Sequence, residues 1–330
     1  MTRTPTTGPT RISSPPTVAR WSVEPRLLLL AGVLVAVIVL FSVLAPGFGS
    51  PANLADVLRQ NVTLVVVAVG LTFVLLAGEL DLSVGAITAL VSVLVAQSVT
   101  TWGLPAVPAV ALGLVVGAGL GAVNALLVLG LKIPSFLSTL AILGVVQGLA
   151  LTVSLSAVDV AGRLGAGFAG SIVGVPVVIL YGAVVVAVAS VVLNRSRFGL
   201  WLRATGSDRD MARLVGLSVA RHRAAVFAIS GLCAGIGGVI LVGRTGFGDA
   251  LSMPGLGIDA LAAVILGGTR LGGGRGSIAG TVLAAILIGF LASGIQAVGL
   301  PSSGQDIVRG VVIGAAVLLM RPPRRKETVA

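Results

Sequence analysis

Three carboxylates stand out in this sequence because their surroundings are almost entirely apolar. Glu79 and Asp81 lie two residues apart in the segment 78–85, and Asp259 lies inside an apolar run. An ionised residue at the centre of a membrane helix costs about 2.5–3.5 kcal/mol on insertion scales, so it must contact protein or water. Carboxylates in such positions bind cations and helix ends, or line a route for polar solutes.

Each polar position has a structural alternative. Asp81 and Ser83 precede an apolar run, so they could cap its first turn instead of lining a pathway. Asn124 and Gln147 lie within apolar runs, where hydrogen bonding between helices is the default expectation. The candidate pathway residues are Glu79, Asp81, Ser83, Asn124, Gln147 and Asp259.

The composition identifies the environment that these residues must tolerate. Hydrophobic residues make up 56% of the 330, charged residues make up 10%, and the mean hydropathy is +1.11. A soluble domain carries about 25% charged residues. The sequence therefore predicts an all-α polytopic membrane protein whose apolar surface is covered by lipid.

The net charge of +11 does not indicate a nucleic-acid partner. The basic residues gather in the two tails and in the segment 194–223, as the positive-inside rule predicts for cytoplasmic segments. One His and one Cys argue against a metal site, a cofactor and an enzyme active site. The stretch 274–279 matches the pattern G-x-G-x-x-A but joins two apolar runs, so we do not expect this chain to bind a nucleotide. If ATP powers its function, another subunit must bind it.

Ten apolar runs can be marked as membrane spans, with both tails and the segment 194–223 on the cytoplasmic side. The eighth run is short and follows a Gly/Pro-rich stretch, as in the interrupted helices of transporters. We expect a disordered cytoplasmic tail at 1–26, a transmembrane domain at 27–320 and a cytoplasmic tail at 321–330. The runs are 27–45, 61–77, 84–101, 106–130, 134–153, 172–193, 224–243, 254–268, 277–299 and 306–320.

Glycines recur every four residues in the fourth run, at Gly113, Gly117 and Gly121. Residues at this spacing share one helix face, and small side chains there let two helix backbones approach closely. We expect this stripe to pack within the subunit, with a dimer interface as the alternative.

The central loop contains a predicted short cytoplasmic helix. Ser207 and Asp210 have the spacing of a capping box, and Gly216 suits a left-handed helix end. The helix would expose apolar side chains, which a partner protein or the lipid headgroups would cover. The candidate residues for coupling to such a partner protein are Gly206, Ser207, Asp208, Arg209, Asp210, Met211, Ala212, Arg213, Leu214, Val215 and Gly216.

Together these stretches resemble the ribose/xylose-type permeases of ATP-binding-cassette (ABC) importers. The similar stretches occur in the family's order and span about 55–310 of the chain. One departure is Gly257, which stands where many members of the family carry a Glu. They are Gly78-Glu79-Leu80-Asp81-Leu82-Ser83-Val84-Gly85, Ile133 to Leu140, Phe198-Gly199 with Ala204, Gly206, Ala212 and Gly216, and Asp259 to Thr269 continuing to Ser277.

The resemblance implies a permease subunit in the bacterial cytoplasmic membrane that translocates a monosaccharide-like solute. It implies a cytoplasmic ABC ATPase, an extracytoplasmic binding protein and a second permease copy or paralogue as partners. The nearest alternative is the same architecture importing branched-chain amino acids or nucleosides. An ion-coupled secondary transporter is a more distant alternative, since intramembrane carboxylates are few.

Overall fold

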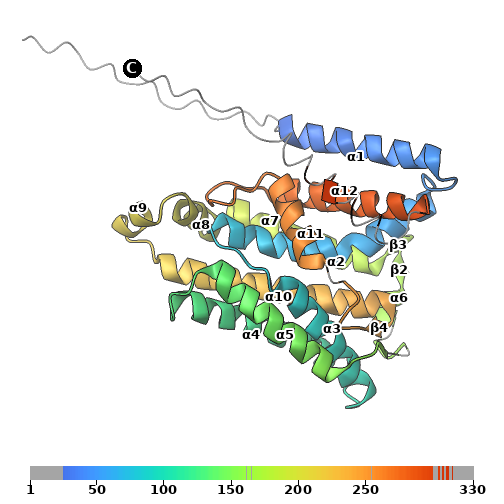
Figure 1. Ribbon diagram of the computed structural model, residues 1–330, viewed down its shortest axis with the longest axis horizontal. Coiled ribbons are helices and arrows are strands. Elements are labelled where there is room, and N and C mark those ends of the chain that lie inside the picture. Colours follow the sequence, from blue (N-terminus) through green and yellow to red (C-terminus); the bar gives the residue numbers. More distant parts are fainter. Residues whose placement is uncertain are drawn as a thin grey trace, which may run out of the picture.

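The computed structural model describes residues 25–160, 162–164, 166–253 and 255–299, and beyond them only 304, 307, 310, 311 and 314. Within this part the chain is a bundle of long helices lying side by side (Figure 1). The predicted tail at 321–330, all but two residues of the tail at 1–26, and most of the tenth span lie outside the described residues.

Seven of the described helices are long and apolar enough to cross a membrane, and α3 and α11 are shorter apolar helices. These nine helices coincide with the first nine predicted apolar runs. The seven are α1 (Pro25–Leu44), α2 (Pro51–Leu76), α4 (Ala106–Leu129), α5 (Ser135–Val153), α7 (Val177–Arg195), α10 (Val219–Thr245) and α12 (Ile278–Ala297). The two shorter ones are α3 (Val84–Thr100) and α11 (Leu256–Leu266).

Three helix starts differ from the prediction by five residues or more. Helix α10 begins at Val219, five residues before the predicted start at 224. Helix α2 begins ten residues before the predicted start at 61, because the Ser50 hydroxyl accepts a bond from the Asn53 N–H and Pro51 occupies the first turn. Helix α7 begins later than predicted. The residues from 172 to 176 form a hairpin instead, with left-handed backbone at Val173 (φ 51°) and Gly174 (φ 78°).

The remaining elements lie at the two ends of the bundle (Figure 1). Helices α8 (Arg197–Ser207) and α9 (Arg209–Leu214) lie at the end we call the α9 end. At the opposite strand end, β1 (Val158–Asp159) pairs antiparallel with β4 (Phe247–Gly248), and β2 (Ser171–Ile172) pairs with β3 (Val175–Pro176) near α6 (Ala166–Ala169).

Helix α2 lies at the centre of the bundle, and every one of its residues from Asn61 to Leu76 is buried. Around it pack α10, α12, α11 and α7. Helix α1 lies along the edge beside α12, and of its residues only Leu30 and Phe41 are buried. A movement of α2 would therefore displace the helices that pack around it.

The glycine stripe of α4 packs against α10 within the chain, as expected. A Cβ added at Gly117 would lie 2.6 Å from the Gly231 carbonyl oxygen, and one at Gly121 would meet the Phe227 carbonyl oxygen. The return contacts come from Gly231 and Gly235. Because the stripe is covered by α10, it is not free to form a dimer interface.

Candidate functional site

The segment 77–83 between α2 and α3 is irregular backbone held in the interior of the protein. The Leu80 N–H donates to the Ser135 hydroxyl (3.1 Å), and the Leu82 N–H donates to the Thr139 hydroxyl (3.2 Å). Buried irregular backbone is tolerated where protein satisfies its polar groups. Helix α5 therefore supplies the bonds that this segment cannot make to itself.

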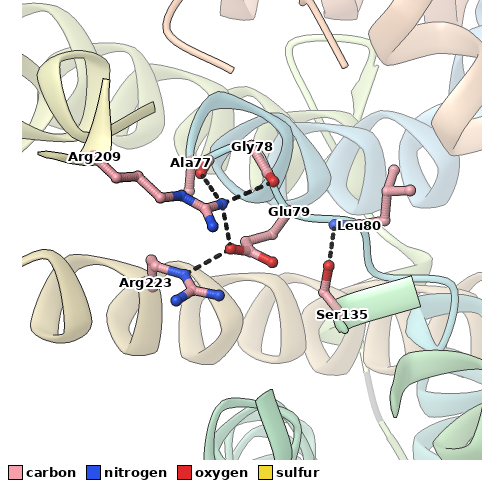
Figure 2. A network of polar contacts seen from close by, with 7 residues as sticks. All are labelled: Ala77, Gly78, Glu79, Leu80, Ser135, Arg209 and Arg223. Atoms are coloured by element: carbon pink, nitrogen blue, oxygen red, sulfur yellow. Dashed lines mark hydrogen bonds and ion pairs between the residues drawn. The ribbon is translucent and has the colours of Figure 1, made fainter. Parts of the chain in front are cut away.

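Glu79 is 4% exposed and binds two arginines through the same oxygen (Figure 2). Its Oε1 lies 2.6 Å from Arg209 Nη2 and 2.6 Å from Arg223 Nε. The Nη2 of Arg209 also donates to the carbonyl oxygens of Ala77 (3.2 Å) and Gly78 (3.0 Å). One guanidinium therefore binds both the carboxylate and the carbonyls that follow α2.

Arg209 and Arg213 of α9 pair with carboxylates in different places. Residues four apart share one face of a regular helix. Instead, Arg209 reaches into the protein to Glu79, and Arg213 pairs with Asp210 on the surface at 2.8 Å. The buried carboxylate attracts the first cation because an unpaired buried charge is costly.

Asp81 links the start of α3 to α10 rather than capping a helix, and Asn124 of α4 joins this network through Ser83. It is 1% exposed, its Oδ1 accepts bonds from the Ser83 N–H (3.0 Å) and hydroxyl (2.6 Å), and its Oδ2 accepts from Ser230 of α10 (2.8 Å). Asn124 of α4 donates to the Ser83 hydroxyl at 2.8 Å. Ser83 occupies the N-cap position of α3 but makes no side-chain cap bond, so the capping hypothesis is wrong for Ser83.

The capping residue of α9 is Asp208, one position after the predicted Ser207. Asp208 Oδ1 accepts bonds from the Asp210 and Met211 N–H groups, both at 3.0 Å. The Ser207 hydroxyl instead donates to the Arg203 carbonyl oxygen, four residues earlier in α8. Gly216 has the predicted left-handed backbone, with φ 81°.

Helix α9 carries an exposed apolar surface, the α9 patch, formed by Met211, Leu214 and Val215. These side chains are 58%, 80% and 71% exposed, whereas Ala212 is buried. The six residues of α9 form a shorter helix than the predicted 207–216. The apolar contact surface that the sequence indicated is nevertheless present.

Backbone contacts between glycines tie α9 to the rest of the α9 end. Gly206, at the end of α8, lies so close to the Leu76 carbonyl oxygen that a Cβ there would overlap it. The Gly274 N–H donates to the same oxygen at 2.9 Å, and Gly273 has left-handed backbone (φ 84°). The loop that carries G-x-G-x-x-A thus packs against the ends of α2 and α8.

The other two candidates lie elsewhere. Asp259, in the first turn of α11, lines a cavity of about 180 Å³ between α2, α11 and α12, together with the polar side chains of Gln60 and Ser293. Gln147 donates to the Ala250 carbonyl oxygen at 3.0 Å and borders a different cavity of about 460 Å³. The six candidates therefore do not form one site.

Sequence reasoning did not assign roles to four residues of this region. Arg223 was counted only as a basic residue of the central loop, and Ser135, Thr139 and Ser230 were not singled out as polar partners. The topology contained a usable signal for Arg223, since it placed Glu79 and the central loop on the same side of the membrane. The hydroxyl partners carried no comparable signal.

Comparisons with known proteins identify the family of the chain. The family described as "Branched-chain amino acid transport system / permease component" matches residues 53–317. The ribose import permease protein of Escherichia coli (strain K12) is 34% identical over 305 residues, which cover 91% of this chain and 94% of the relative. The ribose import permease protein of Bacillus subtilis (strain 168) is 37% identical over 86% of this chain and 89% of its own length.

A third relative, the D-allose transport system permease protein of Escherichia coli (strain K12), is 32% identical over 88% of this chain and 90% of its own length. These matches confirm the resemblance that the sequence motifs indicated. A permease component takes part in transport rather than in catalysis. The chain therefore belongs to the family of transport-system permease components, and within that family to the ribose-type permeases of ABC importers.

Proposed function

We propose that the chain is the membrane-spanning subunit of an importer for a monosaccharide. A separate ATPase would hydrolyse ATP, and an extracytoplasmic binding protein would deliver the sugar. The names of the three relatives, two for ribose and one for D-allose, support a sugar. The family description names branched-chain amino acids, so these are the second candidate substrate.

The observation that carries the coupling role is the α9 patch. It places exposed apolar side chains on a capped helix beyond the ends of the long apolar helices. Exposed apolar groups that cluster in this way favour a protein contact. The ATPase is the partner that an importer of this family needs, and the α9 patch is where we propose that it binds.

The charge distribution supports a cytoplasmic α9 end. Among the described residues, the segment 194–223, Lys132 and the loop 267–277 bring ten basic residues to this end, and the strand end has Arg59, Arg163 and Arg244. Cytoplasmic loops carry the excess of Lys and Arg. Helix α1 also begins at the α9 end, where Arg26 donates to the Ile265 carbonyl oxygen at 3.2 Å.

The partner that covers the outer helices is proposed to be lipid together with a second permease copy or paralogue. Helix α7 exposes Val184, Val188 and Val191, and α4 exposes Val107 and Val115. Apolar side chains on these faces suit lipid tails and helix packing equally well. Binding of a second copy would cover part of them.

The substrate is tested by uptake into proteoliposomes that contain the permease with its ATPase and binding protein. Radiolabelled ribose and D-allose are compared with radiolabelled leucine, with and without ATP. ATP-dependent uptake of a sugar, and none of leucine, is the expected result. Uptake of leucine alone would overturn the sugar assignment, and uptake driven by an ion gradient without ATP would overturn the importer class.

The docking role is tested with Leu214→Asp, which places a charge in the α9 patch, and Gly216→Val, which disfavours the left-handed helix end by about 1–2 kcal/mol. Both variants should lose the ATPase in a pull-down and lose sugar-stimulated ATP hydrolysis. The matched control is Leu155→Asp, an equally exposed leucine at the strand end. Full ATPase binding by both variants would indicate that α9 contacts lipid headgroups instead.

A further inference from the structure

Glu79 is bound by two arginines that belong to different parts of the molecule. Arg209 lies at the start of α9, next to the α9 patch, and its side chain is 38% exposed. Arg223 lies near the start of α10, a long helix packed against α4, α2 and α3, and its side chain is 17% exposed. The two arginines therefore differ in exposure and in the size of the helix that carries them.

The shared carboxylate makes the loss of one arginine tolerable. Removing the partner of a buried ion leaves an uncompensated charge, which is strongly unfavourable. With two cations on the same oxygen, Glu79 stays paired when one of them leaves. Since Arg209 is the more exposed and lies on the short helix α9, it is the arginine that can leave.

Arg209 also binds the end of the central helix of the bundle. Its contacts with the Ala77 and Gly78 carbonyl oxygens place a cation at the C-terminal end of α2, where the helix dipole favours it. Arg209 and Glu79 are 130 residues apart in the sequence. The contact thus connects the surface helix α9 to the most deeply buried helix.

We propose that Glu79 and its two arginines form the link that transmits movement of α9 to α2 during the transport cycle. Arg209 carries the movement, and Arg223 keeps the Glu79 carboxylate paired while Arg209 is detached. The three are positioning residues, since they act through helices and not on the solute. This inference rests on the proposed docking of the ATPase at α9, but it concerns a step after docking.

A second contact between the α8–α9 junction and α2 lies beside the ion pair. Gly206 and Gly274 bring the junction of α8 and α9 against the Leu76 carbonyl oxygen, three residues before Glu79. These backbone contacts hold the α8 side of the junction close to α2. The ion pair is therefore the part of the contact that can open and close as α9 tilts.

The test compares Arg209→Gln, Glu79→Gln and the double variant in proteoliposomes that hold the whole complex. Pull-down of the ATPase should be unchanged, because the α9 patch is intact. Ribose taken up per ATP hydrolysed should fall about tenfold in each single variant, within the usual range of coupling between two sites. The double variant should be no worse than either single one, since both remove the same link.

Arg209→Lys should restore part of the coupling, because the amine keeps the charge but loses the planar fork. Arg221→Gln is the control, since Arg221 is exposed two residues before Arg223 and its loss removes the same charge. Arg223→Gln should also lower the uptake per ATP, with the ATPase still bound. Thermal melting of each purified variant separates a loss of folding from a loss of coupling.

Wild-type ribose-to-ATP ratios in Arg209→Gln and Glu79→Gln, with the ATPase bound, would overturn the link. Additive losses in the double variant would also overturn it, because they would mean that the two residues act separately. If the wild-type permease fails to bind the ATPase, the docking proposal itself is wrong. The two failures are therefore distinguishable in one series of measurements.

Discussion

Each end of the bundle has an arginine that binds the carbonyl groups at a helix C-terminus, but the two arginines differ in burial and in what else they contact. At the α9 end, Arg209 binds the Ala77 and Gly78 carbonyl oxygens and also the buried Glu79 carboxylate. At the strand end, the exposed Arg163 donates to the Val99 and Thr100 carbonyl oxygens at the end of α3, each at 3.1 Å. Both contacts use the favourable interaction of a cation with a helix C-terminus.

The difference lies in burial and in what else each contact joins. The α9 end has a buried carboxylate, side-chain bonds from α5 to the segment 77–83, and glycines in backbone contact. The strand end is closed by two pairs of two-residue strands. Under the proposed function, the densely packed α9 end would transmit movement after the ATPase binds, and the short local contacts of the strand end would rearrange as the solute enters.

The largest expected effect concerns which side of the membrane each end faces. The native Cys233 is buried, so it adds little background to labelling. In intact cells an impermeant maleimide should label Val173→Cys, at the exposed hairpin tip, and leave Asp210→Cys unlabelled. Labelling of Asp210→Cys from outside would reverse the orientation and remove the docking proposal with it.

The packing of the α9 end is tested with one glycine pair. Gly206→Ala should destabilise the protein by about 1–3 kcal/mol or prevent folding, because its Cβ would overlap the Leu76 carbonyl oxygen and backbone cannot move aside. Gly272→Ala lies in the loop beside it with open space around its Cβ position. Thermal melting in detergent should separate the two variants, and equal melting temperatures would contradict the tight packing.

The helices could be predicted from the sequence because hydrophobic length alone defines them. Nine apolar runs correspond to helices, including the short α11. The start of α2 was missed because its first turns carry polar residues such as Asn53 and Asp56. The start of α7 was missed because the apolar run continues into the hairpin that Gly174 allows. Hydropathy measures burial in lipid or protein and not the local backbone.

The polar contacts were less predictable, for a physical reason. The sequence indicated that Glu79, Asp81 and Asn124 need partners, but several hydroxyls were equally placed to supply them. The choice of Asp208 over Ser207 as the cap depended on whether α8 extends to Ser207, which gives its hydroxyl a carbonyl of its own turn. Partner choice across helices depends on their rotation, which composition does not specify.

A smaller effect is expected from Asp259, which lines the cavity in the strand-end half of the bundle. Asp259→Leu should lower sugar uptake about tenfold while insertion and ATPase binding remain, since the cavity loses an acceptor for solute hydroxyl groups. Asp259→Asn is the matched variant, because it keeps an acceptor of the same shape. Unchanged uptake by Asp259→Leu would show that the carboxylate only stabilises the interior.

The smallest effect is expected from Arg163→Gln, the counterpart of Arg209→Gln at the strand end. Removing this cation should cost about 0.3–1 kcal/mol, because the guanidinium is exposed and solvent screens its interaction with the end of α3. The melting temperature should fall slightly, and the fall should shrink further in high salt. The ribose-to-ATP ratio should not change, since none of the described residues supplies a buried carboxylate that links this contact to a second helix. If Arg163→Gln uncouples transport as strongly as Arg209→Gln, the contrast between the two ends is wrong, and movement passes through both.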